Sequence, residues 1–462
     1  MRAVLSFLSC MVLFLPFVVA QGALSAGNNP EKVVLQNYTL AQCIEYALNH
    51  LQSVANAKSD VEIAKMQVGI TRADGLPQIN AGSTMAHNYK LTVAFVPAQF
   101  VNPNAPSGEF IALPFQPPFQ GNAAITASQM LFDATWLLGL RAATVYAQLA
   151  ERNLKRAKAE VVEAVTKAYY SLLIAQKRME LIEATLKRIE TLYNETKAMY
   201  TNGFVEKIDV DRLEVSLNNL KTEKQRALRL IELSKAFLKF QMGLQQTDEI
   251  TLGESLQSIN PEALLLQAQL EDKFDYRLRP EYSVLETQRD LNLLAIKRDK
   301  LGYLPRLLAT FQYGGLTGPS KGEDLFKFNR WNTFGNVGIT ISIPIFDGMR
   351  RYYLIQKSRL ELIKTENTML NLRRAIDLEI RQAQTNLLNA IDNLNTQRRN
   401  MELAAEVARI SQIKYKEGVG SNLEVINAEN DYKQAETSYY NALYEALIAK
   451  VDLDKATGKL LK

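Results

Sequence analysis

Four long stretches of the sequence contain neither glycine nor proline, and they limit most strongly what this chain can fold into. These stretches are Leu140–Asn202, Phe204–Met242, Met349–Glu417 and Ser421–Thr457. They are rich in residues that favour helix, and apolar residues recur every three or four positions, as at Met179, Ile182 and Leu186. At about 1.5 Å per residue, the two longest would each extend over roughly 95–105 Å. Such helices exceed an ordinary globular domain and predict coiled-coil or helical-barrel packing.

The second half of the chain resembles the first. Placing Tyr200 on Tyr415 without gaps also pairs identical residues: Gly203 with Gly418, Val210 with Val425, Glu214 with Glu429, and Gly243 with Gly458. Leu-Pro and Phe-Asp precede these segments in the same order in both halves, as Leu76-Pro77 and Phe132-Asp133, then as Leu304-Pro305 and Phe346-Asp347. We infer an internal duplication in which each half runs helix, strand, loop, strand, very long helix, short break and helix.

The duplication sets the expected boundaries. The first repeat is expected over 31–243 and the second over 276–462, with 244–275 as a linking segment packed around the middle of the long helices. Asp133 and Asp347 each follow an apolar strand and open a long helix, so both are predicted to be N-caps that accept a first-turn backbone N–H.

The N-terminus has the pattern of an export signal. Arg2 precedes an apolar run that ends at Ala20, which predicts a signal peptide over 1–20 with cleavage after Ala20 or as late as Ala26. The alternative is an uncleaved anchor, because the run is nearly long enough to span a bilayer. Cleavage leaves Cys43 as the sole cysteine, so no intramolecular disulfide can form.

Short segments with alternating apolar residues predict strands. Val337, Ile339 and Ile341 alternate with small or polar residues, and a similar pattern begins at Leu307. Pattern alone favours a soluble sheet with one face on a core. A length of about 10–12 residues fits a strand that crosses an outer membrane at a tilt, and no further strands in sequence would supply a second layer.

Four strands from one chain cannot close a barrel, and an open sheet edge is not tolerated in hydrocarbon. Closure therefore requires several copies, and three copies would give twelve strands, within the known size range. The proline-rich loop Lys90–Asn122 and the loop Gly314–Asn336 join the paired strands, so both are expected at the extracellular rim.

The order of these motifs resembles the TolC-like outer-membrane efflux proteins, also called outer membrane factors. The motifs that carry the resemblance are Leu76-Pro77-Gln78-Ile79, Ile343-Pro344-Ile345-Phe346-Asp347-Gly348, Tyr200-x-x-Gly203 and Tyr415-x-x-Gly418. The resemblance implies a mainly α fold with β: a homotrimeric twelve-stranded β-barrel in the outer membrane, four strands per protomer, continuous with a long periplasmic α-helical barrel.

The same resemblance implies the function and the partners. The chain would be the outer-membrane exit duct of a tripartite efflux or type I secretion system, in contact with outer-membrane lipid. Its partners would be a periplasmic membrane-fusion adaptor and an inner-membrane pump of the RND or ABC type. The pump supplies the energy, so the duct is not an enzyme and needs no cofactor.

The resemblance also implies site residues at the tips. Tyr415 matches the family's gating tyrosine, whereas Gly420 and Asn427 stand where the family has an arginine and an acid, so the polar latch is only partly present. Asp209 and Glu424, each six residues after a tip glycine, match acids that face the pore. The alternative is that both are first-turn acids favoured by the helix dipole.

The adaptor-docking tips would be Gly203, Phe204, Gly418 and Val419, which match the family's tip residues.

Two other classes of protein compete with the duct. An enzyme is disfavoured because His50 and His87 lie far apart, and no phosphate loop or metal-ligand spacing occurs. A periplasmic coiled-coil adaptor or structural rod would carry one long hairpin, not two strand-and-helix repeats. Acidic and basic residues are interleaved, which argues against nucleic-acid binding.

Overall fold

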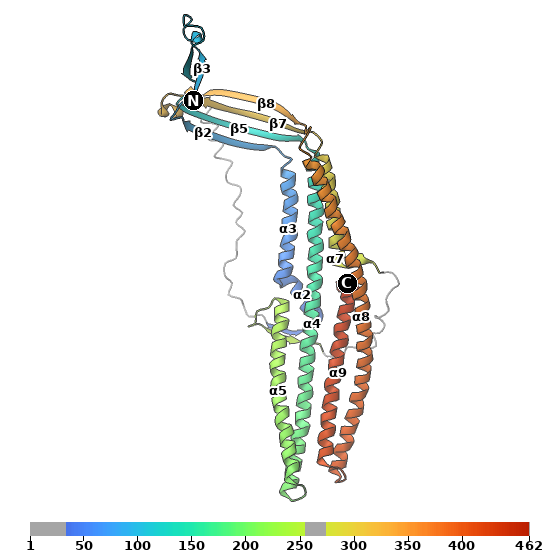
Figure 1. Cartoon of the computed structure of the whole chain (residues 1–462). Helices are drawn as coiled ribbons and strands as arrows, with labels where there is room; N and C mark the ends of the chain where they lie inside the picture. Colours follow the sequence, from blue (N-terminus) through green and yellow to red (C-terminus); the bar gives the residue numbers. More distant parts are fainter. Residues whose placement is uncertain (1–33, 255–273, 462) are drawn as a thin grey trace.

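The structure is a computed structural model that describes residues 34–254 and 274–461. A four-stranded sheet lies at one end of an elongated molecule, and long helices run from it to two tips at the far end (Figure 1). The predicted signal peptide over 1–20 lies outside the described residues, as does most of the linking segment over 244–275. Within the described ranges, no helix is both long and apolar enough to span a bilayer.

The helical part is dominated by two antiparallel hairpins, one made of α4 and α5 and the other of α8 and α9 (Figure 1). The α-helices are α2 Leu40–His50, α3 Gln52–Ala73, α4 Ala134–Thr201, α5 Lys207–Met242, α7 Pro280–Leu301, α8 Arg350–Lys416 and α9 Asn422–Ala456. α4 and α8 have 68 and 67 residues, and α5 and α9 have 36 and 35. Each glycine- and proline-free stretch therefore forms one continuous helix.

The main sheet has four antiparallel strands in the order β2-β5-β7-β8. These strands are β2 Gln78–His87, β5 Phe119–Phe132, β7 Arg306–Thr317 and β8 Asn332–Ser342. In the described chain, β2 and β8 are edge strands that each pair on one side only. The element order repeats as α3-β2-β5-α4-α5 and α7-β7-β8-α8-α9. The domain boundaries drawn from the duplication stay a prediction.

One face of the main sheet exposes large apolar side chains. Ile79, Ala127, Phe311 and Val337 lie in one row of the strand register, one residue from each strand. The exposed fractions of Ile79, Phe311 and Val337 are 71%, 46% and 78%. Residues on a sheet face that packs against a protein core are shielded from solvent. This face of the main sheet therefore does not cover a core within the described chain.

The first long helix begins where Asp133 caps it. The Asp133 carboxylate accepts hydrogen bonds from the backbone N–H groups of Thr135 and Trp136 at 2.7 and 3.3 Å. Arg306 at the start of β7 lies 3.3 Å from the same carboxylate. These contacts hold the pKa of Asp133 below its ordinary value, against the opposing effect of burial, so the carboxylate stays ionised.

The second long helix starts differently, and the prediction that Asp347 is its N-cap residue is wrong. Gly348 and Met349 both have positive φ, +65° and +66°, so the helix begins only at Arg350 and Met349 occupies the cap position. The Asp347 carboxylate still accepts a hydrogen bond from the Arg351 backbone N–H at 3.2 Å. Two left-handed residues have therefore moved the start of the helix beyond the acid.

Two smaller sheets lie outside the main one. β1 Val34–Tyr38 pairs in parallel with β6 Glu249–Leu252, beside α2 and near the middle of the long helices. β3 Val93–Pro97 pairs with β4 Phe110–Pro114 as an antiparallel hairpin. This hairpin lies inside the segment 90–122, for which the sequence predicted a proline-rich loop and no strands. Short 3₁₀ helices cover Ala98–Phe100, Tyr276–Leu278, Gly322–Phe326 and Phe328–Arg330.

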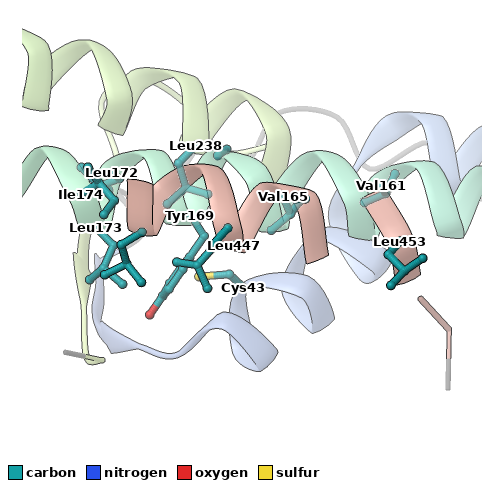
Figure 2. Close-up of a cluster of buried hydrophobic side chains, with 14 of the residues drawn as sticks. Cys43, Val161, Val165, Tyr169, Leu172, Leu173, Ile174, Leu238, Leu447 and Leu453 are labelled. Carbon is teal, nitrogen blue, oxygen red and sulfur yellow. The ribbon is translucent and has the colours of Figure 1, made fainter. Parts of the chain in front are cut away.

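The main hydrophobic core lies where α2 crosses the long helices. Tyr169 and Leu172 of α4 pack with Leu238 of α5, Leu447 of α9 and Cys43 of α2 (Figure 2). All five are almost fully buried. Burial, together with the nearby carboxylate of Glu254, raises the pKa of the Cys43 thiol to about 12, so this cysteine is an inert packing residue.

Candidate functional site: the helical tips

Each helical hairpin reverses direction at a glycine with positive φ. Gly203 has a φ of +80° and Gly418 a φ of +75°, a region that other residues enter at a cost. Phe204 and Val419 follow these glycines and are 80% and 79% exposed. The two turns lie together at the end of the molecule remote from the sheet (Figure 1).

Tyr415 joins the two hairpins just above the tips. Its hydroxyl lies 3.1 Å from Oγ1 of Thr196 on α4, and both side chains are buried. A small apolar cluster surrounds the ring, formed by Leu192, Leu213 and Val425 from α4, α5 and α9. The predicted gate tyrosine therefore connects the end of α8 to the other hairpin within a single chain.

The two predicted acids have different surroundings. Asp209 is half-buried; its backbone carbonyl accepts a hydrogen bond from Nδ2 of Asn422 at 3.0 Å, and its carboxylate lies 3.8 Å from Arg212. Glu424 is exposed, and its backbone N–H donates to the Ser421 hydroxyl that caps α9. Both acids lie in the first turn of a helix, where the dipole favours negative charge.

A polar cluster between the hairpins was not predicted from the sequence. Arg188 of α4 donates from Nε to the carboxylate of Glu429 on α9 at 3.1 Å, and Gln412 of α8 donates to the other oxygen of that carboxylate. Glu429 is only 3% exposed. The Arg188 guanidinium also lies over the ring of Tyr432, 5.3 Å from its centroid. One buried carboxylate thus ties together three helices from both hairpins.

Further ionisable groups continue this contact away from the tips. Lys433 of α9 pairs with Glu223 of α5. Burial raises the pKa of Glu436, although a hydrogen bond from Tyr432 opposes the shift. The Tyr432 hydroxyl has its own pKa raised to about 12 by burial. Between the apolar cluster at Tyr415 and the main hydrophobic core, the contact between the hairpins is therefore a layer of buried and partly buried charges and hydroxyls.

The position of Glu429 in the sequence already indicates that its side chain is buried. It lies four residues after Val425 and so on the same face of α9, which is the buried face. Its counterpart in the duplication, Glu214, is exposed on α5. An acid on an apolar stripe predicts a buried partner, but which residue supplies it depends on the crossing of α4 and α9.

A groove between α5 and α9 opens beside the tips. It has a volume of about 570 Å³. Its apolar lining residues are Ile208, Val215, Leu220, Leu423 and Ile426. Asp211, Arg212 and Asn430 add polar groups to the same lining. Across the described residues, no group of three or more histidine, cysteine, aspartate and glutamate side chains has the arrangement of a metal site. The groove beside the tips is therefore lined by both apolar and polar side chains.

Comparison with known proteins agrees with this architecture. Relatives include the outer membrane protein OprJ of Pseudomonas aeruginosa, 23% identical over 91% of this chain and 84% of the relative. The outer membrane protein TolC of Escherichia coli is 19% identical over 92% of this chain and 83% of its own. The alkaline protease secretion protein AprF of Pseudomonas aeruginosa is 22% identical over 73% of this chain and 68% of its own.

Solved structures share the fold. The outer membrane protein VceC of Vibrio cholerae has a TM-score of 0.68 at 17% identity, over 91% of this chain and 96% of its own. The MtrE outer membrane channel of Neisseria gonorrhoeae has a TM-score of 0.71 at 18% identity, over 92% of this chain and 89% of its own. The family model for outer membrane efflux proteins matches residues 43–239 and 286–459 of this chain. This chain belongs to the outer membrane efflux protein family.

Proposed function

We propose that three copies of this chain form the outer-membrane exit duct of a tripartite efflux or type I secretion system. The observation that supports this proposal most directly is an open four-stranded sheet that is apolar on one exposed face. The sheet continues directly into long helices that end at two tips. Lipid leaves no water to satisfy the unpaired groups of β2 and β8, so these edges need strands from other copies. Three copies would give a closed barrel of twelve strands.

The helical part supports a periplasmic duct. Helices α4 and α8 run from the sheet toward the tips, so closure of the sheet would place three pairs of hairpins around one axis. At the end remote from the membrane, Tyr415 and the Glu429 cluster would hold the two hairpins of each chain together. Exposed Glu424 side chains from three copies would form a ring that attracts cations.

The tips support docking of a periplasmic membrane-fusion adaptor. Phe204 and Val419 expose apolar side chains beside the groove between α5 and α9. A helical hairpin could place its apolar stripe in such a groove. An inner-membrane pump of the RND or ABC type, whose genes would lie near this one, would deliver the cargo and supply the energy.

The test begins with location and assembly. Cell fractions should contain the protein in the outer membrane, and purified protein should have the mass of a trimer. In planar bilayers it should conduct ions without any nucleotide. A soluble, non-trimeric periplasmic protein would overturn the proposal and favour the adaptor or rod alternative.

Adaptor docking has a separate test. Replacing both Phe204 and Val419 by serine should weaken adaptor binding by about 2 kcal/mol, roughly 30-fold in Kd, because exposed apolar anchors carry most of such binding energy. Binding of the purified adaptor to immobilised trimers measures this change. Asn202→Ser, an exposed substitution in the same turn, is the matched control. Unchanged adaptor affinity in the double variant would exclude the tips as the docking site.

A further inference from the structure

The β3–β4 hairpin protrudes from the main sheet. It interrupts the connection from β2 to β5 and projects beyond the sheet, away from the helices (Figure 1). Its end is fixed by hydrogen bonds from the backbone N–H groups of Ala98 and Asn102 to the carbonyls of Glu109 and Ala98, at 2.8 and 2.9 Å. At its base, Asn88 donates from its backbone N–H to the carbonyl of Pro118 at 2.7 Å.

The surface of this hairpin is unusually apolar for an exposed element. Phe95, Phe100, Phe110 and Phe115 are 63–85% exposed. The sequence from Leu91 to Pro118 contains no lysine or arginine, and Glu109 is its one acid. A two-stranded hairpin is at best marginally stable alone in water, and exposed apolar patches of this kind mark contact sites. These side chains therefore form a candidate contact surface for something outside a single chain.

The position of the hairpin indicates what that partner is. It grows from β2, an edge strand of the sheet. In the closed barrel of the proposed function, β2 pairs with β8 of the next copy, so each hairpin rises beside a neighbouring chain. Three copies of a nearly uncharged surface can meet at a threefold axis without repulsion, whereas three like-charged loops could not.

We propose that the β3–β4 hairpins of three copies pack against one another through Phe95, Phe100, Phe110 and Phe115, and narrow the outer mouth of the duct. This inference rests on the trimer of the proposed function. Lipid is a poorer occupant because the hairpin projects past the strands that would cross the membrane. It also lacks the basic residues that bind an anionic membrane surface.

Spin labels distinguish the occupants. Cys10 and Cys43, the two cysteines of the sequence, are replaced by alanine, and a nitroxide is attached to Phe100→Cys in trimers purified and returned to lipid vesicles. The expected spectrum shows spin–spin broadening that disappears when labelled chains are diluted with unlabelled ones. A label at Lys321→Cys, exposed in the β7–β8 loop, should show no broadening and free access to a water-soluble nickel complex.

A second label tests the role of the aromatic side chains. Broadening at Val101→Cys should disappear when the four phenylalanines are replaced by serine, while the particle mass remains that of a trimer. A trimer whose Phe100→Cys label is unbroadened and accessible to oxygen in the bilayer would overturn the inference in favour of lipid. An unbroadened label accessible to nickel would overturn it in favour of a free surface. A protein that is not trimeric would contradict the proposed function itself. The experiment therefore distinguishes a failure of the proposed function from a failure of the hairpin contact.

Discussion

At the scale of single residues, Glu429 shows how duplicated positions acquire different roles. The inferred duplication pairs it with Glu214, which lies equally far after the other tip glycine. Glu214 remains exposed on α5, whereas Glu429 is buried between Arg188 and Gln412. A buried carboxylate without hydrogen bonds would be costly. The cluster therefore fixes how the two hairpins of one chain meet.

Replacing Glu429 by alanine should loosen this contact. The substitution removes hydrogen bonds to a charged group, which contribute about 1.5–3 kcal/mol, so amide exchange in the last turns of α8 should rise roughly 10- to 100-fold. Hydrogen exchange read by mass spectrometry measures this. Glu214→Ala, at the exposed equivalent position, should leave exchange nearly unchanged. Equal effects of the two substitutions would mean that the buried cluster has no special role.

Residue-level contacts were the hardest to predict. The sequence indicates that the tip glycines matter, because they stand at the ends of long unbroken helices, and the family resemblance singles out Tyr415. Thr196 and Arg188 lie within the last four turns of α4, where in the sequence they look like ordinary solvent-facing residues. Their contacts with Tyr415 and Glu429 depend on how α4 crosses the second hairpin, a relation that helical periodicity does not contain.

At the scale of elements, the helices followed the sequence closely and the strands less so. Four glycine- and proline-free stretches became four helices, because nothing within them interrupts the backbone ladder. β8 ends at Ser342, although alternation continues to Ile345, since Pro344 has no N–H for a ladder. The β3–β4 hairpin escaped prediction because Pro97 and Pro114 suggested a loop; both lie at strand ends, where proline is tolerated.

The apolar face of the sheet makes a prediction at this scale. Val337→Lys should destabilise the folded barrel by about 2–4 kcal/mol, the cost of a lysine facing lipid near the middle of the bilayer. Asn336→Lys, one residue away and on the opposite face of β8, should have a much smaller effect. Denaturant unfolding of protein folded in lipid vesicles measures both. A larger effect at position 336 would mean that the lipid-facing and lumen-facing sides are reversed.

At the scale of the whole molecule, the two repeats give the proposed trimer an approximate sixfold character, and their differences decide how it closes. Both hairpins end in similar glycine turns. However, Asp209 is held by Asn422 and lies near Arg212, whereas Glu424 is exposed. The family resemblance implied that both acids face the pore. The surroundings of Glu424 leave its charge more available to ions in solution.

The pore charge can be measured from the periplasmic side. Multivalent cations should block conductance of trimers in planar bilayers, because a ring of carboxylates attracts them. Glu424→Gln should relieve more of the block than Asp209→Asn, whose carboxylate has a neighbouring arginine. The blocking concentration in each variant gives the comparison. Block that is unchanged in the double variant would remove both acids from the pore.

The length of α4 also has a mechanical consequence. This helix runs without interruption for 68 residues, from its cap at Asp133 beside the sheet to the turn at Gly203, about 100 Å at 1.5 Å per residue. A rigid helix of this length can act as a lever whose pivot lies at its Asp133 end, beside the sheet. A tilt of about 3° at that pivot displaces the far end by roughly 5 Å, comparable with the width of a side chain. An aperture at the tips can therefore widen while the hydrogen-bonded strands at the pivot stay almost still.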